Sequence, residues 1–188
     1  GPNCHPNCDC GRFLEIGNSV FMAYKKTADG FELLPKPNVD FGGGLERIAA
    51  VKLNSPDVFK ISLLWPIIES LEQLSGKKYT DHQQSMRVIS DHLRAAMFLI
   101  NDGALPSNKE QGYVVRRLMR RAIRFALDIG IEQDLTSRQA PIIAGLYKDD
   151  FSELMKNEAS ITEAMVREEK AFRQTLRNGL KEFEKLFK

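Results

Sequence analysis

The chain has 188 residues, 43% of them hydrophobic and 28% charged, with a formal net charge of +2 at pH 7. These values are typical of one or two folded globular domains and exclude a disordered chain. The small net charge means that any basic surface for nucleic acid must be local. The most apolar stretch, residues 58–74, is interrupted by Pro66 and by charged residues, so we expect no membrane span and a cytoplasmic protein.

All three cysteines, Cys4, Cys8 and Cys10, lie within the first ten residues, and His5 lies among them. An odd number of cysteines without a secretory leader argues against a disulfide framework. Three sulfur donors and one imidazole form the ligand set of a tetrahedral zinc site, so residues 4–10 are a candidate zinc knuckle. The spacing is not that of a standard zinc finger, and a loose N-terminus with reduced thiols is an equally good interpretation.

Residues 12–26 are rich in strand-forming residues in approximate alternation. Residues 27–30, Thr-Ala-Asp-Gly, predict a turn, and residues 31–34 predict a returning strand that ends before Pro35. This part of the sequence therefore predicts an antiparallel β-hairpin.

Residues 37–51 join this strand pattern to a helical one and contain three consecutive glycines, residues 42–44. A glycine run lets a flat ligand lie directly against the backbone. Arg47 falls near the start of an apolar helix, where a guanidinium suits phosphate oxygens. No Gly-Lys-Ser/Thr follows, which excludes a P-loop. From spacing alone, a glycine-rich turn with a solvated Arg47 is the favoured alternative.

From residue 55 onward the pattern is helical. We expect helices over residues 58–74, with Pro66 as a candidate bend and Gly76 after its end, and over residues 82–101, 113–127, 135–147 and 151–188. Pro141 is expected to bend or break the fourth helix. The last helix carries an apolar stripe that we expect to pack on the preceding helices, made of Ile161, Met165, Phe172, Leu176, Leu180, Phe183 and Phe187.

The helix over residues 113–127 carries arginines at every third or fourth position: Arg116, Arg117, Arg120, Arg121 and Arg124. The acidic residues near them in the sequence are Glu110 and Asp128. A stripe of this kind is the expected footprint of contacts to a phosphate backbone. The alternative is a solvated helix face with local ion pairs.

Residues 38–51, Asn-Val-Asp-Phe-Gly-Gly-Gly-Leu-Glu-Arg-Ile-Ala-Ala-Val, resemble the third signature motif of class II aminoacyl-tRNA synthetases, in the version of the alanyl-tRNA synthetases. Residues 87–96, 102–108 and 112–124 resemble the tRNA-recognising helices of the same family, in the same order. The resemblance implies an α+β chain in two parts. Residues 1–54 would hold a hairpin from the catalytic sheet, and residues 55–188 a mostly helical domain for the tRNA acceptor stem.

The resemblance also implies which residues bind the substrates. Alanine would be bound by Asn18, Val20, Asp40 and Gly42, with Asp40 holding its ammonium group. ATP, accompanied by Mg²⁺, would be bound by Gly44, Glu46 and Arg47. The acceptor stem of tRNA(Ala) would lie on the five arginines, and Asn108, in the loop of residues 106–108, would read its G·U wobble pair.

The sequence departs from the family pattern at Gly17, usually Trp, and at Phe41 and Gly43, usually Thr and Met. The first two class II motifs are absent from this sequence, so we expect an enzyme fragment with no complete catalytic site and no adenylation activity by itself. Two alternatives remain: a tRNA- or RNA-binding module that has lost its chemistry, and a zinc-pinned helical interaction domain.

Overall fold

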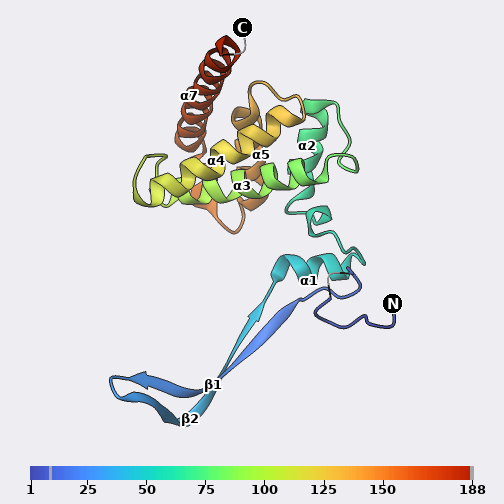
Figure 1. Cartoon of the computed structure of the whole chain (residues 1–188), viewed down its shortest axis with the longest axis vertical. Helices are drawn as coiled ribbons and strands as arrows, with labels where there is room; N and C mark the ends of the chain where they lie inside the picture. The colour runs from blue at the N-terminus through green and yellow to red at the C-terminus, as the bar shows by residue number, and fades with distance from the viewer. Residues whose placement is uncertain (9, 187–188) are drawn as a thin grey trace. The chain divides into compact units, whose positions relative to one another are not determined.

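The computed structural model describes residues 1–8 and 10–186. The chain divides into two compact units, Gly1–Ile61 (the hairpin unit) and Ser62–Lys188 (the helical unit). The hairpin unit contains β1 (Gly17–Thr27), β2 (Gly30–Gly43), α1 (Leu45–Lys52) and the 3₁₀ helix η1 (Val58–Lys60) (Figure 1). The helical unit contains α2 (Trp65–Ser75), α3 (Gln83–Asn101), α4 (Glu110–Asp128), α5 (Leu135–Tyr147), α6 (Ser152–Lys156) and α7 (Glu158–Lys185). The predicted α+β class is confirmed.

The returning strand of the hairpin is longer than predicted. β2 continues to Gly43, whereas the sequence predicted an end at residue 34. The register explains the difference, because residues 34–37, which include both prolines, lie in an irregularity opposite Ala23. Outside the hydrogen-bonded ladder a proline loses no bond through its missing N–H, so regular pairing resumes at Asn38.

The hairpin unit leaves most of its apolar side chains exposed. Within its described residues the buried apolar side chains are Ala50 and Ile61. Exposed fractions between 46% and 78% are found for Val20, Phe21, Phe31, Leu33, Val39, Phe41, Leu45 and Ile48. A two-stranded hairpin without a covering layer is only marginally stable in water, so these faces are suited to burial against further protein.

The hydrophobic core lies in the helical unit. Helix α3 packs against α4, α7 packs against α5 and α4, and α2 packs against α5 and α3. The largest fully buried side chains of this unit are aliphatic residues and methionines on several helices: Leu64, Ile67, Ile68, Leu71, Met86, Ile89, Leu93, Met97, Met119, Ile123 and Ile129. The bounds of α3 and α5 agree with the prediction, and α4 begins three residues earlier than predicted, at Glu110.

The predicted helix over residues 58–74 is wrong. Its first part is the short η1, and α2 begins separately at Trp65. Pro66 therefore does not bend a helix but stands in the first turn of one, where its missing N–H would have had no intrahelical partner. Gly76 follows α2 in the left-handed conformation, with φ +66°, as expected of a helix end.

The predicted single helix over residues 151–188 is also wrong, because the chain interrupts it at Asn157, between α6 and α7. The side-chain amide of Asn157 donates to Asn101 Oδ1 at the end of α3, 3.0 Å away. This contact ties the interruption to a neighbouring helix. In α5, by contrast, the helix is continuous through Pro141, so the chain is not broken there.

The apolar stripe of α7 packs on other helices only in part. Ile161 and Met165 are buried, whereas Leu180 and Phe183 are 61% and 58% exposed. Phe187, the last member of the predicted stripe, lies outside the described residues. No helix among the described residues has the length and apolar character needed to cross a bilayer.

Glu169 of α7 joins two helices of the helical unit. Its carboxylate accepts the backbone N–H of Thr136 at 2.8 Å, the Thr136 hydroxyl at 2.6 Å and the N–H of Leu135 at 3.3 Å. Arg173 Nε donates to the same carboxylate at 2.8 Å. The first N–H groups of α5 have no intrahelical acceptors, so a buried carboxylate from α7 serves as their cap and pairs its charge with Arg173.

Candidate functional site

The four residues predicted to bind alanine occupy one face of the hairpin. Asn18 pairs directly with Gly42, and Val20 pairs directly with Asp40. Opposite residues of an antiparallel pair share a face, as do alternate residues along a strand. Asn18 Oδ1 lies 3.4 Å from the position that a Cβ on Gly42 would take, so the amide extends over the glycine. The register thus places a carboxylate, an amide and an open glycine side by side.

Gly17, Phe41 and Gly43, the three residues expected to depart from the family pattern, lie together on the other face. A Cβ at Gly17 would lie 3.0 Å from Cζ of Phe41, and a Cβ at Gly43 would lie 3.3 Å from Cε1 of the same ring. The Phe41 ring therefore fills the space beside both glycines. The three residues are therefore in mutual steric contact, on the face of the hairpin opposite to Asp40.

Arg47 is held at the junction between the strand and the helix. Its Nη1 donates to the backbone oxygen of Glu15 at 3.0 Å, and its Cδ lies 3.1 Å from the Cβ position of Gly44. Gly44 itself donates its N–H to Ile16 at 2.8 Å. With 48% of its side chain exposed, Arg47 is neither buried nor simply solvated. The predicted ATP-binding residues Gly44, Glu46 and Arg47 thus lie together at the first turn of α1.

The arginines of α4 divide into two rows. Arg116 and Arg120 turn toward Glu168 of α7, whose oxygens accept their Nε groups at 3.2 Å and 2.8 Å. Glu168 is only 6% exposed, whereas Arg116 and Arg120 are 22% and 38% exposed, so both ion pairs are partly buried. This acid could not be predicted from the local pattern, because it lies about fifty residues away along the chain. Two of the five arginines are therefore paired with an acid on another helix, which neither the phosphate-contact interpretation nor the alternative of local ion pairs predicted.

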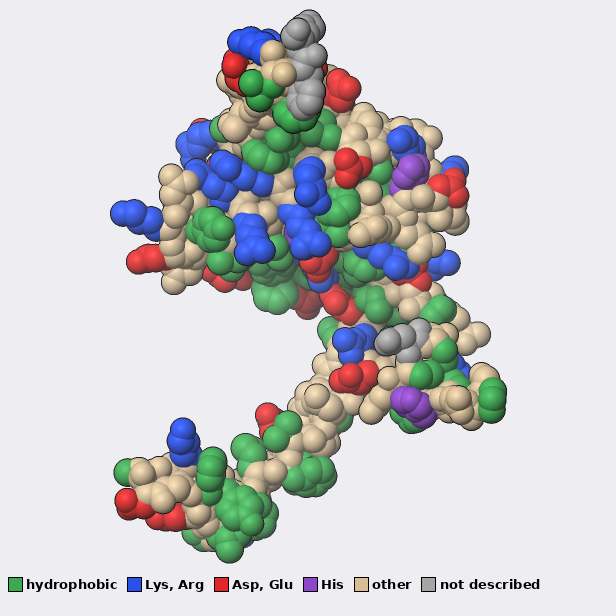
Figure 2. All heavy atoms as spheres, in the orientation of Figure 1, with side chains coloured by type: hydrophobic (Ala, Val, Ile, Leu, Met, Phe, Trp, Pro, Cys, Tyr) green, Lys and Arg blue, Asp and Glu red, His purple; other side chains and the backbone are tan. Residues whose placement is uncertain are grey.

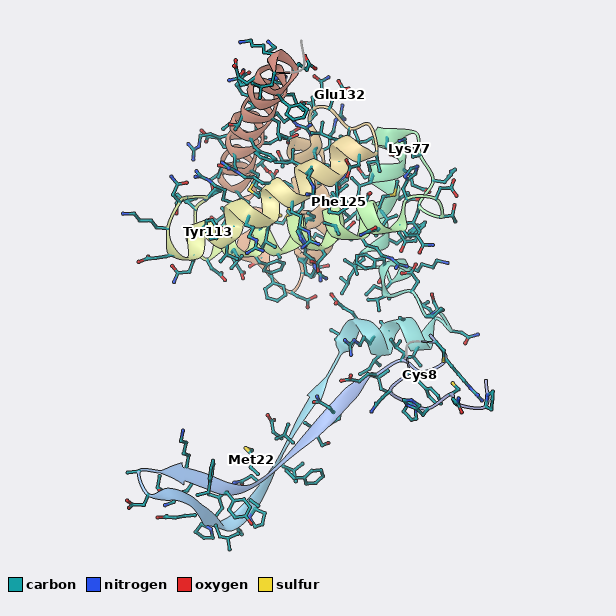
Figure 3. All side chains as sticks on the ribbon, in the orientation of Figure 1. Cys8, Met22, Lys77, Tyr113, Phe125 and Glu132 are labelled. Atoms are coloured by element: carbon teal, nitrogen blue, oxygen red, sulfur yellow. The ribbon has the colours of Figure 1, made fainter. Side chains whose placement is uncertain are left out.

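The other three arginines, Arg117, Arg121 and Arg124, are exposed, and we call them the exposed row. Figure 2 shows Lys and Arg side chains gathered over the face of the helical unit on which α4 lies in Figure 1. The guanidinium carbons of Arg121 and Arg124 lie 5.9 Å and 5.1 Å from the ring centre of Phe125, which is labelled in Figure 3. Such cation–π contacts orient a guanidinium while its N–H groups can still bind phosphate oxygens.

The loop between α3 and α4 presents Asn108 to solvent. Asn108 Oδ1 accepts a hydrogen bond from Arg116 Nη1. The same loop is fixed to α4 by Gly112, whose backbone oxygen accepts the N–H of Ser107 at 3.0 Å. A Cβ on Gly112 would lie 2.4 Å from the Leu105 oxygen, so only glycine lets the loop approach so closely. This role of Gly112 was not predicted from the sequence, although a glycine inside a helical pattern was an available signal.

The cysteines come together in the N-terminal segment, where Figure 3 labels Cys8. The sulfur atoms are 2.9 Å apart for Cys8 and Cys10, 3.2 Å for Cys4 and Cys10, and 3.5 Å for Cys4 and Cys8. Hydrogen bonding with Cys10 raises the pKa of Cys4 and lowers the pKa of Cys8 to about 7. A zinc ion bonded to sulfur at about 2.3 Å would need sulfur atoms roughly 3.8 Å apart, so small side-chain rotations would admit one.

The fourth predicted zinc ligand, His5, lies apart from the three sulfur atoms. Among the described residues, the group close enough to share a metal contains Cys4, Cys8 and Cys10 but not His5. His5 Nδ1 instead accepts the backbone N–H of Asn7 at 3.2 Å, closing a local turn. Asp9 lies outside the described residues.

Comparison with known proteins shows which family the chain belongs to. The family described as tRNA synthetases class II (A) matches residues 2–188. The chain belongs to this family. It is 46% identical over 185 residues to the alanine–tRNA ligase of Desulfosudis oleivorans, covering 96% of the chain and 21% of that protein. The ligase of Halalkalibacterium halodurans is 40% identical over 189 residues, covering 98% of the chain and 22% of that protein. The chain therefore spans about a fifth of the length of these relatives.

Replacing Gly112 by alanine tests the docking of the loop. The new methyl group would collide with Leu105 and Ser107, so we expect Gly112→Ala to lower the free energy of unfolding by about 1–3 kcal/mol. Gly145→Ala, in the exposed interior of α5 with no atom near its Cβ, is the matched control and should raise it by about 0.5–1 kcal/mol. Urea unfolding measures both, and equal stabilisation by the two changes would contradict the close approach.

Proposed function

We propose that this chain is the part of an alanine–tRNA ligase that carries the third class II motif and the helices binding the acceptor stem of tRNA(Ala). The complete protein would activate alanine with ATP and Mg²⁺ in the cytoplasm and transfer it to tRNA. The observation that carries the proposal is the hairpin register, which gathers Asn18, Val20, Asp40 and Gly42 on one face. Family membership and the printed names of the relatives support it.

The hairpin unit would supply part of the activation site. Asp40 offers a carboxylate for the ammonium of alanine, and Asn18 lies on the same face to orient the substrate. Arg47, held beside Gly44, would bind ATP phosphate oxygens, and Glu46 adds a carboxylate of the type that Mg²⁺ prefers. The exposed apolar faces of the unit fit a position inside a larger catalytic domain.

The helical unit would bind the acceptor stem. The exposed row of Arg117, Arg121 and Arg124 provides positive charge for phosphates, and Asn108 in the adjoining loop provides a group that can read a base edge. The runner-up function is an RNA-binding module derived from the synthetase that has lost its chemistry. The same row of arginines favours this function. Only a measurement of alanine activation in the longer protein distinguishes the RNA-binding module from the ligase.

We also propose that Cys4, Cys8 and Cys10 bind one Zn²⁺ ion. The support is the approach of three sulfur atoms to within 3.5 Å of one another in a short segment. Three thiolates leave one position of a tetrahedral site for a further ligand. A metal there would stiffen the segment that leads into β1.

Binding to tRNA tests the acceptor-stem proposal. The chain should bind tRNA(Ala) with the G·U pair roughly tenfold more tightly than the same tRNA with a G·C pair. Arg121→Gln should weaken both complexes and lower the salt dependence by about one counterion, because it removes one phosphate contact. Fluorescence anisotropy titrations across salt concentrations measure both effects.

The matched control is Arg167→Gln, which removes the same charge from an exposed position on α7 and should change binding less. Equal affinity of the unmodified chain for the two tRNAs, or no binding at low salt, would contradict the acceptor-stem proposal. Equal effects of the two arginine changes would contradict the assignment of the exposed row.

Asp40→Asn tests the alanine site in the longer protein. The change keeps the shape but removes the charge opposite the substrate ammonium, so kcat/KM for alanine should fall roughly 10- to 100-fold. Asp29→Asn, in the exposed turn of the same hairpin, is the control and should retain the rate. ATP–pyrophosphate exchange gives both values, and an unchanged rate in Asp40→Asn would remove the carboxylate from the site.

Metal analysis tests the zinc proposal. The purified chain should retain about one equivalent of Zn²⁺ after dialysis, and Cys10→Ser should lose it, because two thiolates hold zinc poorly. His5→Ala should retain the metal, since His5 lies outside the sulfur group. Replacement by Co²⁺ should give thiolate-to-metal absorption. A metal-free chain whose thiols react equally fast with and without added Zn²⁺ would contradict the site.

A further inference from the structure

A chain of hydrogen bonds links the centre of α7 to the loop that precedes α4 in the sequence. Glu168, on α7, is 6% exposed and accepts Arg116 Nε at 3.2 Å. Arg116 in turn donates through Nη1 to Asn108 Oδ1. The guanidinium of Arg116 therefore donates through Nε to the buried carboxylate of Glu168 and through Nη1 to the exposed amide of Asn108. A guanidinium fixed in this way has little freedom to leave for a phosphate.

The direction of the Arg116 contact decides which end of the Asn108 amide faces outward. A guanidinium has only donors, so the atom of Asn108 that faces Arg116 must be the carbonyl oxygen. This holds even though amide oxygen and nitrogen are otherwise assigned from their surroundings. The N–H groups of Asn108 are then the ones that can be presented to a ligand.

The backbone of the loop supports the same orientation. Ser107 Oγ accepts the N–H of Lys109 at 3.2 Å and donates to the Lys109 oxygen at 2.9 Å, so the residues on both sides of Asn108 are bonded to each other. The Ser107 N–H is bonded to Gly112. The loop fixes the backbone of Asn108, and Arg116 fixes its side chain.

We propose that Arg116, held by Glu168, is a positioning residue that sets Asn108 as a hydrogen-bond donor to an acceptor atom on a base edge of the acceptor stem. This inference rests on the proposed acceptor-stem function. It gives the arginines of α4 different tasks. The exposed row supplies sequence-independent phosphate contacts, and Arg116 contributes to the choice between base pairs without touching RNA.

A double-mutant cycle on pair preference tests the coupling of the two residues. Pair preference is the ratio of Kd values for tRNA with the G·C pair and tRNA with the G·U pair. Asn108→Ala should reduce this ratio roughly tenfold. Arg116→Ala should reduce it by a similar factor, and the double variant should lose little more, because both changes remove the same oriented amide. Arg121→Ala should lower the affinity for both tRNAs and combine additively with Asn108→Ala.

A role of Arg116 in phosphate binding or in folding alone would give a different pattern. Arg116→Ala would then weaken both complexes equally, keep the pair preference and add to Asn108→Ala, and this result would overturn the proposal. Glu168 keeps Arg120 as a partner in this variant, at 2.8 Å, so its buried charge stays paired and the fold should survive. Thermal unfolding of the variant checks that it does.

Asn108→Asp tests the donor assignment without altering Arg116. The aspartate has the same shape and pairs with Arg116 through an oxygen, but it has no N–H to donate. We expect the pair preference to disappear while the melting temperature is retained. A preserved preference would show that Asn108 accepts from the RNA and would overturn the assignment.

The unmodified chain separates this inference from the proposed function. If it shows no preference for the G·U pair, the acceptor-stem function fails. If it shows the preference and Arg116→Ala retains it, only the positioning role fails.

Discussion

The helical unit depends on the hydrogen bonds and ion pairs of two neighbouring carboxylates on α7, those of Glu168 and Glu169. Both are almost fully buried, so each must have charged or hydrogen-bonding partners to offset the loss of water. The carboxylate of Glu169 is hydrogen-bonded to the start of α5 and paired with Arg173. The carboxylate of Glu168 is paired with Arg116 and Arg120 of α4. One turn of α7 thereby fixes the positions of two other helices. Because Arg116 also bonds to Asn108, the same turn reaches a residue of the candidate RNA surface.

In the hairpin unit, the strand register determines which side chains lie together, because the described residues of the unit form almost no buried core. Its strands place Asp40, Val20, Asn18 and Gly42 on one face and Gly17, Phe41 and Gly43 on the other. The Phe41 ring lies where a side chain at Gly17 or Gly43 would meet it, on the face away from Asp40. The candidate alanine face keeps the residue types that the proposed chemistry requires.

The two units differ in what they need from the rest of a protein. The helical unit has a buried apolar core that runs from α2 to the first half of α7, whereas the hairpin unit leaves aromatic and aliphatic residues exposed on both strands. The relatives are about five times as long as this chain. A hairpin with two uncovered faces is consistent with service as one piece of a larger sheet.

The sequence by itself determined the hairpin, the junction of β2 with α1, the bounds of α3 and α5, and the family, because local periodicity and contiguous motifs contain that information. It also predicted Asp40, Arg47 and Asn108 as site residues, which stay predictions of role. Only the tertiary structure decided that two of the five arginines are paired with Glu168, that His5 stands apart from the cysteines, and that Gly112 seats the loop. Each of these depends on groups brought together by folding or on the direction of a side chain, and neither is encoded in local spacing. The interruption at Asn157 belongs to the same class, since its side chain bonds to Asn101 on another helix.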